Sequence, residues 1–150
     1  FSSARDIHLL LRRLHRCLAE ADPFLPASLV QEFFSRDPTV AGSTCALGWD
    51  MPSAENSSSG SYFSPSSIGH LGFTGTSVWS DLEKDCHVIL LSNRVHPSGA
   101  NDKIKTFRPY IHDLIMKARL KAGWITEADL APAEEEGEEA EGADEVGEEA

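Results

Sequence analysis

Apolar residues at helical spacing predict the first two helices of the chain. In residues 3–18 an apolar side chain recurs every three or four positions, which places one apolar stripe along a helix. Ser3 can cap the start of this helix, and the carboxylate of Asp6 lies near the positive end of the helix dipole. A second, shorter helix is expected to begin at Pro26, because the fixed φ of proline suits a first helical position. Its apolar face consists of Leu29, Val30, Phe33 and Phe34.

A third helix is predicted over residues 102–122, and Gly123 supplies its end. Pro109 lies inside this pattern and either kinks the helix or marks the start of its second part. The side that we expect to face the core consists of Ile104, Phe107, Ile111, Leu114, Ile115 and Ala118.

Short apolar segments between the helices predict strands. They cover residues 46–51, 67–72, 76–81 and 87–92, whereas residues 52–67 are rich in Ser, Pro and Asn and predict a surface loop. The last apolar segment does not alternate with polar residues, so we expect it to be covered on both faces.

Helices before and after consecutive strands predict an α+β fold, with three antiparallel strands flanked by helices. A strand that is covered on both faces at the edge of a sheet would leave an apolar edge unpaired, which favours aggregation. We therefore expect a segment outside this sequence to pair with residues 87–92.

The negative charge of the chain is concentrated at its end. The net charge is −11, yet residues 132–150 hold ten acidic residues and no basic ones, so the rest carries 14 acidic and 13 basic side chains. These last residues have too few apolar side chains to form a core, which predicts a disordered acidic tail, either a solvated tail or a docking motif. The near-neutral body has no basic stripe, which disfavours nucleic-acid binding, and no apolar run approaches the roughly 18 residues of a membrane span.

The cysteines and histidines predict neither a disulfide nor a metal site. Cys17, Cys45 and Cys86 are widely spaced among apolar neighbours, so we expect them to be small buried side chains. Most histidines lack the spacing of metal ligands, and no cofactor is predicted. These are His8, His15, His87, His96 and His112.

Several segments carry motifs in a recognisable order. Residues 69–79 read Gly-His-Leu-Gly-Phe-Thr-Gly-Thr-Ser-Val-Trp, and Asn-Arg-Val-His-Pro follows the next strand at 93–97. Phe-Ser-Ser-Ala-Arg-Asp at 1–6 and Leu-Gly-Trp at 47–49 precede them. In this order the segments resemble the C-terminal third of the serine β-lactamase-like hydrolases, which include class C β-lactamases, family VIII carboxylesterases and penicillin-binding proteins.

The resemblance covers about residues 1–122 and implies a partial β-lactamase-like hydrolase domain whose N-terminal part lies outside this sequence. Residues 123–150 are then a linker and the acidic tail. In that family a Ser of a Ser-x-x-Lys motif attacks an ester or amide carbonyl, and the Lys and a Tyr of a Tyr-x-Asn motif move the proton. Neither motif occurs here. No Ser is followed by Lys at the third position, and the nearest case is Ser67, which is followed by His70. Neither Tyr62 nor Tyr110 is followed by Asn two residues on. The resemblance therefore implies that the nucleophile is not in this chain.

The third family motif supplies the candidate site residues. By resemblance, His70 would lie beside the proton relay, and Leu71 stands where a Thr or Ser usually contacts substrate. Gly72 would leave the strand bare so that an acyl group can lie against the backbone, and the Phe73 amide would donate to an oxyanion. Leu71 lacks a hydroxyl, and an imidazole binds a substrate carboxylate less well than a permanently charged Lys. The motif thus favours a small ester or amide substrate over a carboxylate-bearing β-lactam.

Two hypotheses of different class follow. The chain is part of a serine hydrolase that works through an acyl-enzyme, or it is a non-catalytic module of the same fold that binds partners. His70 can also be an ordinary strand histidine, and Gly72 and Gly75 can simply shape a hairpin. We expect this chain alone to be inactive and marginally stable, with exposed apolar surface. Its substrate, compartment and oligomeric state are left open.

Overall fold

The first helix begins and ends where the sequence predicts. The computed structural model describes residues 2–130, in which α1 spans Ala4–Leu18. Ser3 is its N-cap, and the Asp6 amide donates to Ser3 Oγ at 3.2 Å. Helix α2 spans Ala27–Phe33, and Pro26 precedes it as the N-cap instead of occupying the first helical position.

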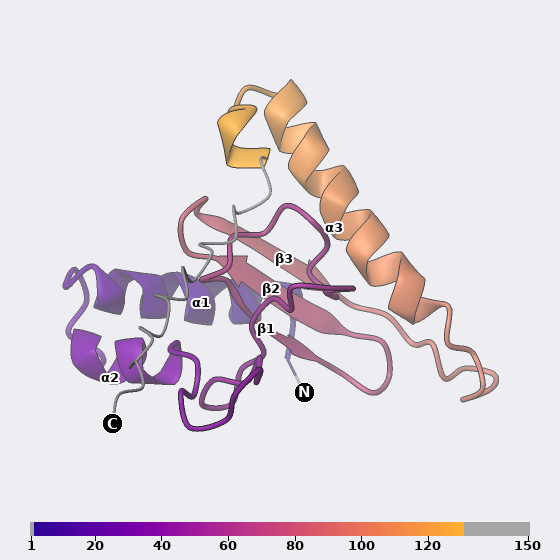
Figure 1. The fold of residues 1–150 in the computed structure, drawn as a ribbon, viewed down its shortest axis with the longest axis horizontal. Coiled ribbons are helices and arrows are strands. Elements are labelled where there is room, and N and C mark those ends of the chain that lie inside the picture. Colours follow the sequence, from indigo (N-terminus) through magenta and orange to yellow (C-terminus); the bar gives the residue numbers. More distant parts are fainter. Residues whose placement is uncertain (1, 131–150) are drawn as a thin grey trace, which may run out of the picture.

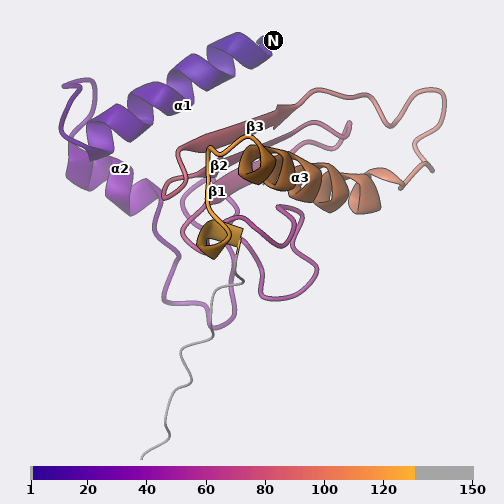
Figure 2. The ribbon, with the colours of Figure 1, turned by 90° about the horizontal axis from the view of Figure 1, so that it is seen from above.

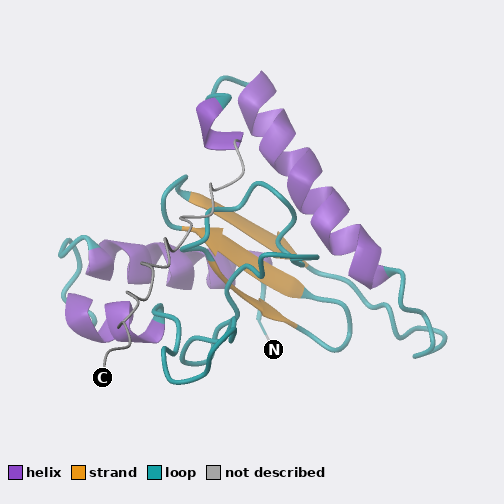
Figure 3. Ribbon diagram, in the orientation of Figure 1, coloured by secondary structure: helices purple, strands orange, loops and turns teal. Residues whose placement is uncertain are grey.

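Three of the predicted strands form one antiparallel sheet (Figures 1 and 3). Strands β1 (Ile68–Leu71), β2 (Ser77–Asp81) and β3 (Cys86–Leu90) lie in the order β1-β2-β3. In their register Trp79 is opposite Gly69 on one side and Val88 on the other. The α+β class and the antiparallel sheet are therefore confirmed.

The prediction of a strand at residues 46–51 is wrong. Cys45 and Asp50 form an isolated bridge, and Asp50 forms a second bridge with Gly69 at the edge of β1. Gly48 has a φ of +77°, which reverses the chain between the two bridged residues. The apolar segment is therefore a tight turn that covers part of the β1 edge.

Helices cover both faces of the sheet. Figure 2 shows α1 on one side of the sheet and α3 (Ile104–Lys121) on the other. Because side chains alternate along a strand, Ser80 faces α1 while its neighbour Trp79 faces α3. Each face has its own apolar cluster. The α3 cluster consists of Phe63, Trp79, Cys86, Val88 and Met116, and the α1–α2 cluster of Cys17, Val30, Phe34 and Ile68.

Helix α3 buries a different face from the predicted one. Its buried side chains are Arg108, His112 and Met116, at i, i+4 and i+8, whereas Phe107 and Leu114 are 43% and 47% exposed. Backbone carbonyls of the loops explain this choice, since Arg108 and His112 contact carbonyls of Gly72 and Ser58. The helix continues through Pro109.

The prediction for the cysteines is correct at two of three positions. Cys17 and Cys86 are buried, and all three thiols are free. Cys45 is exposed, because it lies on the tight turn outside the two clusters.

Apolar surface is left uncovered within the described residues. Strand β3 pairs there only with β2, and its outer edge has no neighbouring strand. A groove of about 500 Å³ is lined by apolar side chains of α1, α2, the loop between them and the turn that follows, among them Leu14, Leu25, Leu29, Phe33, Leu47 and Trp49.

The core reaches the end of the described chain. A 3₁₀ helix spans Ala128–Leu130, and Ile125 and Leu130 pack against the cluster that contains Met116. The acidic tail predicted for residues 132–150 lies outside the described residues. In the part that the structure describes, no helix is both long enough and apolar enough to cross a membrane.

The buried face of α3 can be tested by comparing two substitutions on that helix. Met116→Ala removes a fully buried side chain, so we expect it to lower the free energy of unfolding by about 2–5 kcal/mol. Leu114→Ala is the matched control and should cost less than about 1 kcal/mol, because Leu114 is largely exposed. Denaturant unfolding of the two variants measures both values, and equal losses would contradict this packing.

Candidate functional site

The predicted motif lies at the end of β1, where a four-residue turn leads to β2. The Gly75 amide closes this turn by donating to the Gly72 carbonyl at 3.0 Å. Gly75 has a φ of +101°, and a Cβ there would lie 2.6 Å from Ser92 Oγ. Both the backbone conformation and the close approach of Ser92 therefore require glycine at position 75.

Two arginines hold the carbonyl groups of this turn. Arg108 Nη2 donates to the carbonyls of Gly72 and Thr76 at 2.9 and 2.7 Å. Arg94 Nε donates to the Phe73 carbonyl at 2.8 Å, and its guanidinium lies 4.8 Å from the centroid of the Phe73 ring. The turn is thus fixed through its acceptors.

This arrangement leaves the Phe73 amide free. The N–H and C=O of a trans peptide point in opposite directions, so the Phe73 N–H points away from the side where Arg108 binds the Gly72 carbonyl. Within residues 2–130 this N–H has no hydrogen-bond acceptor, and Phe73 is 77% exposed. A fixed, accessible backbone donor is the type of group that stabilises an oxyanion.

The other motif residues lie beside this turn on different faces of the sheet. His70 faces the α1 side and is exposed, and its imidazole has no hydrogen-bond partner among the described residues. Leu71 is half-buried on the α3 side. Gly72 is required for packing, since a Cβ there would collide with Thr76 Oγ1. A ligand can therefore reach His70 and the Phe73 amide, whereas Leu71 points toward the α3 side.

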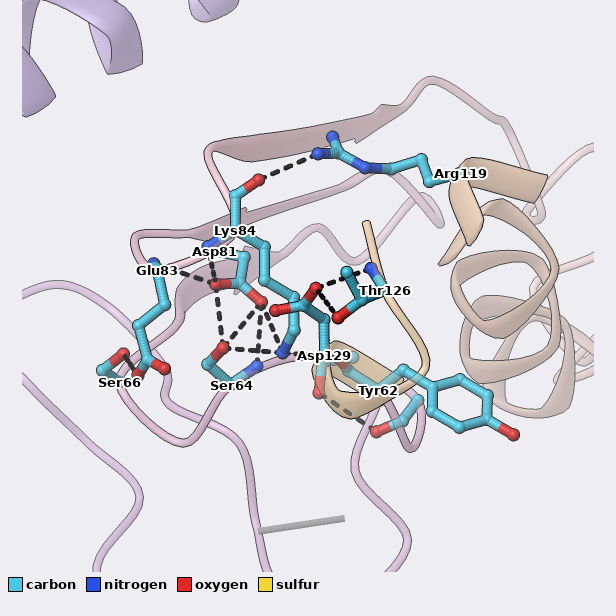
Figure 4. A network of polar contacts seen from close by, with 11 residues as sticks. Tyr62, Ser64, Ser66, Asp81, Glu83, Lys84, Arg119, Thr126 and Asp129 are labelled. Atoms are coloured by element: carbon cyan, nitrogen blue, oxygen red, sulfur yellow. Dashed lines mark hydrogen bonds and ion pairs between the residues drawn. The ribbon is translucent and has the colours of Figure 1, made fainter. Parts of the chain in front are cut away.

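A Ser–Lys pair that the sequence did not predict lies at the other end of β2. Lys84 Nζ donates to Ser64 Oγ at 2.8 Å (Figure 4). Lys84 Nζ also lies 3.5 Å from Asp81 Oδ2, and the Asp81 side chain is fully buried. Ser64 is 3% exposed and its Oγ donates to the Asp81 carboxylate, so this hydroxyl is committed to a structural contact. This pair is therefore not a substitute for the missing nucleophile.

The Asp81 carboxylate instead holds the β2–β3 hairpin to the preceding loop. It accepts hydrogen bonds from the amides of Ser64, Glu83 and Lys84 at 2.9, 3.0 and 2.9 Å. Figure 4 shows these donors converging on the one carboxylate. A buried carboxylate is tolerated because its lone pairs are satisfied in this way.

A cluster of histidines lies on the α1 face of the same hairpin. We call His8, His15, Ser80, Asp85 and His87 the histidine cluster. Ser80 Oγ lies 2.8 Å from His15 Nε2 and 2.8 Å from His87 Nδ1. His15 Nδ1 lies 3.9 Å from Asp85 Oδ1. The rings of His8 and His15 both meet the His87 ring edge-on, with centroids 5.4 and 4.6 Å apart.

Burial keeps the two inner imidazoles neutral. Burial is the largest of the causes that lower the pKa of His87 to about 4, and the neighbouring His15 and His8 contribute in the same direction. Burial also lowers the pKa of His15, against the opposing effect of Asp85. At pH 7 both rings therefore carry an unprotonated nitrogen.

Ser80 does not act as a nucleophile despite its two histidine neighbours. Its side chain is fully buried between α1 and the sheet, so no substrate carbonyl can approach Oγ. The cluster therefore has ligands and proton acceptors but no accessible attacking group.

Sequence spacing could not have revealed this cluster. His15 and His87 are separated by more than seventy residues and meet only because α1 packs on β3. Only the spacing of His8 and His15, two helical turns apart, hints that they share one helix face.

Comparisons with known proteins add no assignment. No family model matches the chain, and neither a curated protein nor a solved structure does so.

The Asp81 network predicts a large loss of stability when its acceptor is changed. Asp81→Asn turns one carboxylate oxygen into a donor and leaves Lys84 without its counter-charge, which should cost about 3–5 kcal/mol. Asp102→Asn is the control, because Asp102 is exposed and its side chain makes no hydrogen bond within residues 2–130. Denaturant unfolding should show a near-neutral effect for the control, and a similarly small effect for Asp81→Asn would contradict the assignment.

The histidine cluster predicts that the protein loses stability in mild acid. The pKa of His87 is about 4 in the folded chain and about 6.5 in the unfolded one, so the unfolded chain binds the extra proton first. Titration of His87 therefore leaves the free energy of unfolding unchanged above about pH 6.5 and lowers it as the pH falls toward 4. His87→Gln should flatten the denaturant midpoint against pH in this window, though not fully, since His15 and His112 titrate in the same direction. Identical pH profiles of the two proteins would argue against a half-buried, neutral His87.

Proposed function

We propose that residues 1–122 form the C-terminal part of a β-lactamase-like serine hydrolase, which hydrolyses an ester or amide through an acyl-enzyme. The chain supplies the His70 strand and one oxyanion donor. The Ser nucleophile and its proton relay come from an N-terminal part of the same domain, outside this sequence.

The free Phe73 amide is the observation that carries this proposal. Attack on an ester or amide carbonyl places negative charge on the carbonyl oxygen, and backbone N–H groups held in advance stabilise that charge. Arg94 and Arg108 hold the turn through its carbonyls and leave this one N–H exposed. In the proposed hydrolase the second donor is the amide of the nucleophilic Ser.

The side chains beside this amide indicate the substrate class. His70 is exposed next to the turn and can hydrogen-bond with the proton relay. Leu71 offers no hydroxyl and is turned to the α3 side. Neither side chain provides a permanent positive charge for a substrate carboxylate, which favours a neutral short-chain ester or amide.

Uncovered apolar surface supports a missing part of the domain. The outer edge of β3 has no partner within the described residues. On α3, Phe107, Tyr110 and Leu114 follow one another at i, i+3 and i+7 and are 43%, 62% and 47% exposed. A strand on β3 and a helix on this face of α3 would cover both surfaces.

The second candidate is a non-catalytic module with the same fold. Leu71 favours it, because the family position that contacts substrate has lost its hydroxyl. Esterase activity of the longer protein would exclude this candidate.

The oxyanion role can be tested by removing a single hydrogen-bond donor, the N–H of residue 73, from the backbone. Phe73 occupies the second position of the turn that Gly72 and Gly75 close, where proline is favoured. In the longer protein, Phe73→Pro should lower kcat for a short-chain p-nitrophenyl ester about 100- to 1,000-fold. Phe73→Ala is the matched control and should retain activity within about tenfold, because it keeps the amide and removes only an exposed ring.

Two outcomes would overturn the proposal. One is a coding region without Ser-x-x-Lys and Tyr-x-Asn upstream of residue 1. The other is a Phe73→Pro variant that folds and hydrolyses the ester as fast as Phe73→Ala. The chain of residues 1–150 alone should not be labelled by a fluorophosphonate probe, and labelling of any Ser in it would place the nucleophile elsewhere.

A further inference from the structure

Three side chains with metal-binding atoms converge between α1 and the β2–β3 hairpin. His15 comes from α1, and Asp85 and His87 come from the hairpin turn and the start of β3. One ligand atom from each of the three lies within 4.8 Å of the other two. None of these residues belongs to the proposed oxyanion site, so this inference does not rest on the proposed function.

Ser80 contacts both imidazole rings. Its Oγ lies 2.8 Å from both His15 Nε2 and His87 Nδ1, and a hydroxyl oxygen can accept from both N–H groups through its two lone pairs. The opposite nitrogens, His15 Nδ1 and His87 Nε2, are then unprotonated. His15 Nδ1 faces Asp85, and His87 Nε2 is buried without a hydrogen-bond partner within the described residues. A hydroxyl on the second ring nitrogen is a common outer-shell partner of metal-bound histidine.

We propose that His15, Asp85 and His87 bind one zinc ion or a similar divalent transition-metal ion. Two imidazoles and one carboxylate form a ligand set that Zn²⁺ prefers, whereas Ca²⁺ and Mg²⁺ prefer oxygen ligands alone. A water molecule or the exposed His8, whose ring adjoins that of His87, supplies the fourth ligand.

The geometry needs only a small movement of the turn. Ligands about 2.1 Å from a tetrahedral Zn²⁺ lie about 3.4 Å apart, so atoms that now lie within 4.8 Å of one another must approach by at most about 1.4 Å. Asp85 can make this movement, because its side chain is 71% exposed and it lies at the tip of the hairpin.

Arg12 competes with a metal ion for the Asp85 carboxylate. Arg12 Nη1 lies 3.8 Å from Asp85 Oδ2, and its side chain is 52% exposed. The metal would compete with Arg12 for this carboxylate, and Arg12 can turn to solvent. The other charged groups near the rings are Asp81 on the sheet and His8 on α1.

Binding of the metal would join two parts of the chain that are distant in sequence. Helix α1 packs on β3, where His8 and His15 of α1 contact the His87 ring. A metal ion held by both elements would fix α1 to the sheet and stabilise the folded state by mass action.

Titration of the 150-residue chain with ZnCl₂ at pH 7 tests the proposal by calorimetry. We expect one Zn²⁺ per chain and, at a free concentration of about 100 times Kd, a rise in Tm of about 5–10 °C. Asp85→Asn is the most informative variant. Asp85 has a φ of +43°, which Asn also tolerates, so the turn is kept and the charged ligand is lost. Because loss of an outer-shell partner alone typically costs about 10- to 100-fold in metal affinity, loss of this ligand should raise Kd at least as much.

Two further variants and a control separate this site from adventitious binding. His87→Gln should also raise Kd, whereas Arg12→Gln should lower it, since the competing cation is removed. Asp102→Asn removes an exposed carboxylate elsewhere and should leave Kd unchanged. Absence of Zn²⁺ binding by the folded wild-type chain, or binding that Asp85→Asn and His87→Gln leave unchanged, would overturn the proposal.

Discussion

Strand β2 has a strand at each edge and a helix over each face, and the alternation of its side chains decides where the neighbouring elements can lie. Trp79 points toward α3 and is the largest fully buried side chain of the protein's described part. Ser80 points toward α1 and holds the two inner histidines. Asp81 ends the strand and collects the amides of the hairpin. Three consecutive residues thus connect the sheet to both helical layers and to its own turn.

Much of the interior is polar, and several of its buried groups have specific partners. Arg108 donates hydrogen bonds to two carbonyls at the β1–β2 turn, and Asp81 accepts them from amides of the β2–β3 turn and the preceding loop. Since an unpaired buried polar group costs about 1–3 kcal/mol, such partners restrict each segment to one position. The same restriction produces the free Phe73 amide, because the carbonyls around it are already bound.

The two candidate sites share the α1 face of the sheet. Ile68, Ser80 and His87 form one cross-strand row, and His70 belongs to the next row, about 7 Å along the strands. The α1 helix covers the first row, which makes Ser80 inaccessible and keeps His87 neutral. His70 is left exposed, so one face of one sheet carries a partly buried cluster with metal-binding atoms and an open position for a ligand.

Local signals in the sequence determined most of the elements. The apolar stripe and the Ser3 cap predicted α1, short apolar segments predicted the three strands, and glycines predicted the turn beside Gly72. These features depend on neighbours within a few residues, which is why sequence alone reveals them. The buried face of α3, the failure of residues 46–51 to form a strand and the meeting of His15 with His87 were decided by tertiary structure. Each depends on a contact between distant segments: Arg108 with a turn carbonyl, Asp50 with the β1 edge, and α1 with β3. No local pattern encodes which polar groups such contacts must satisfy, and this is why only the folded chain shows them.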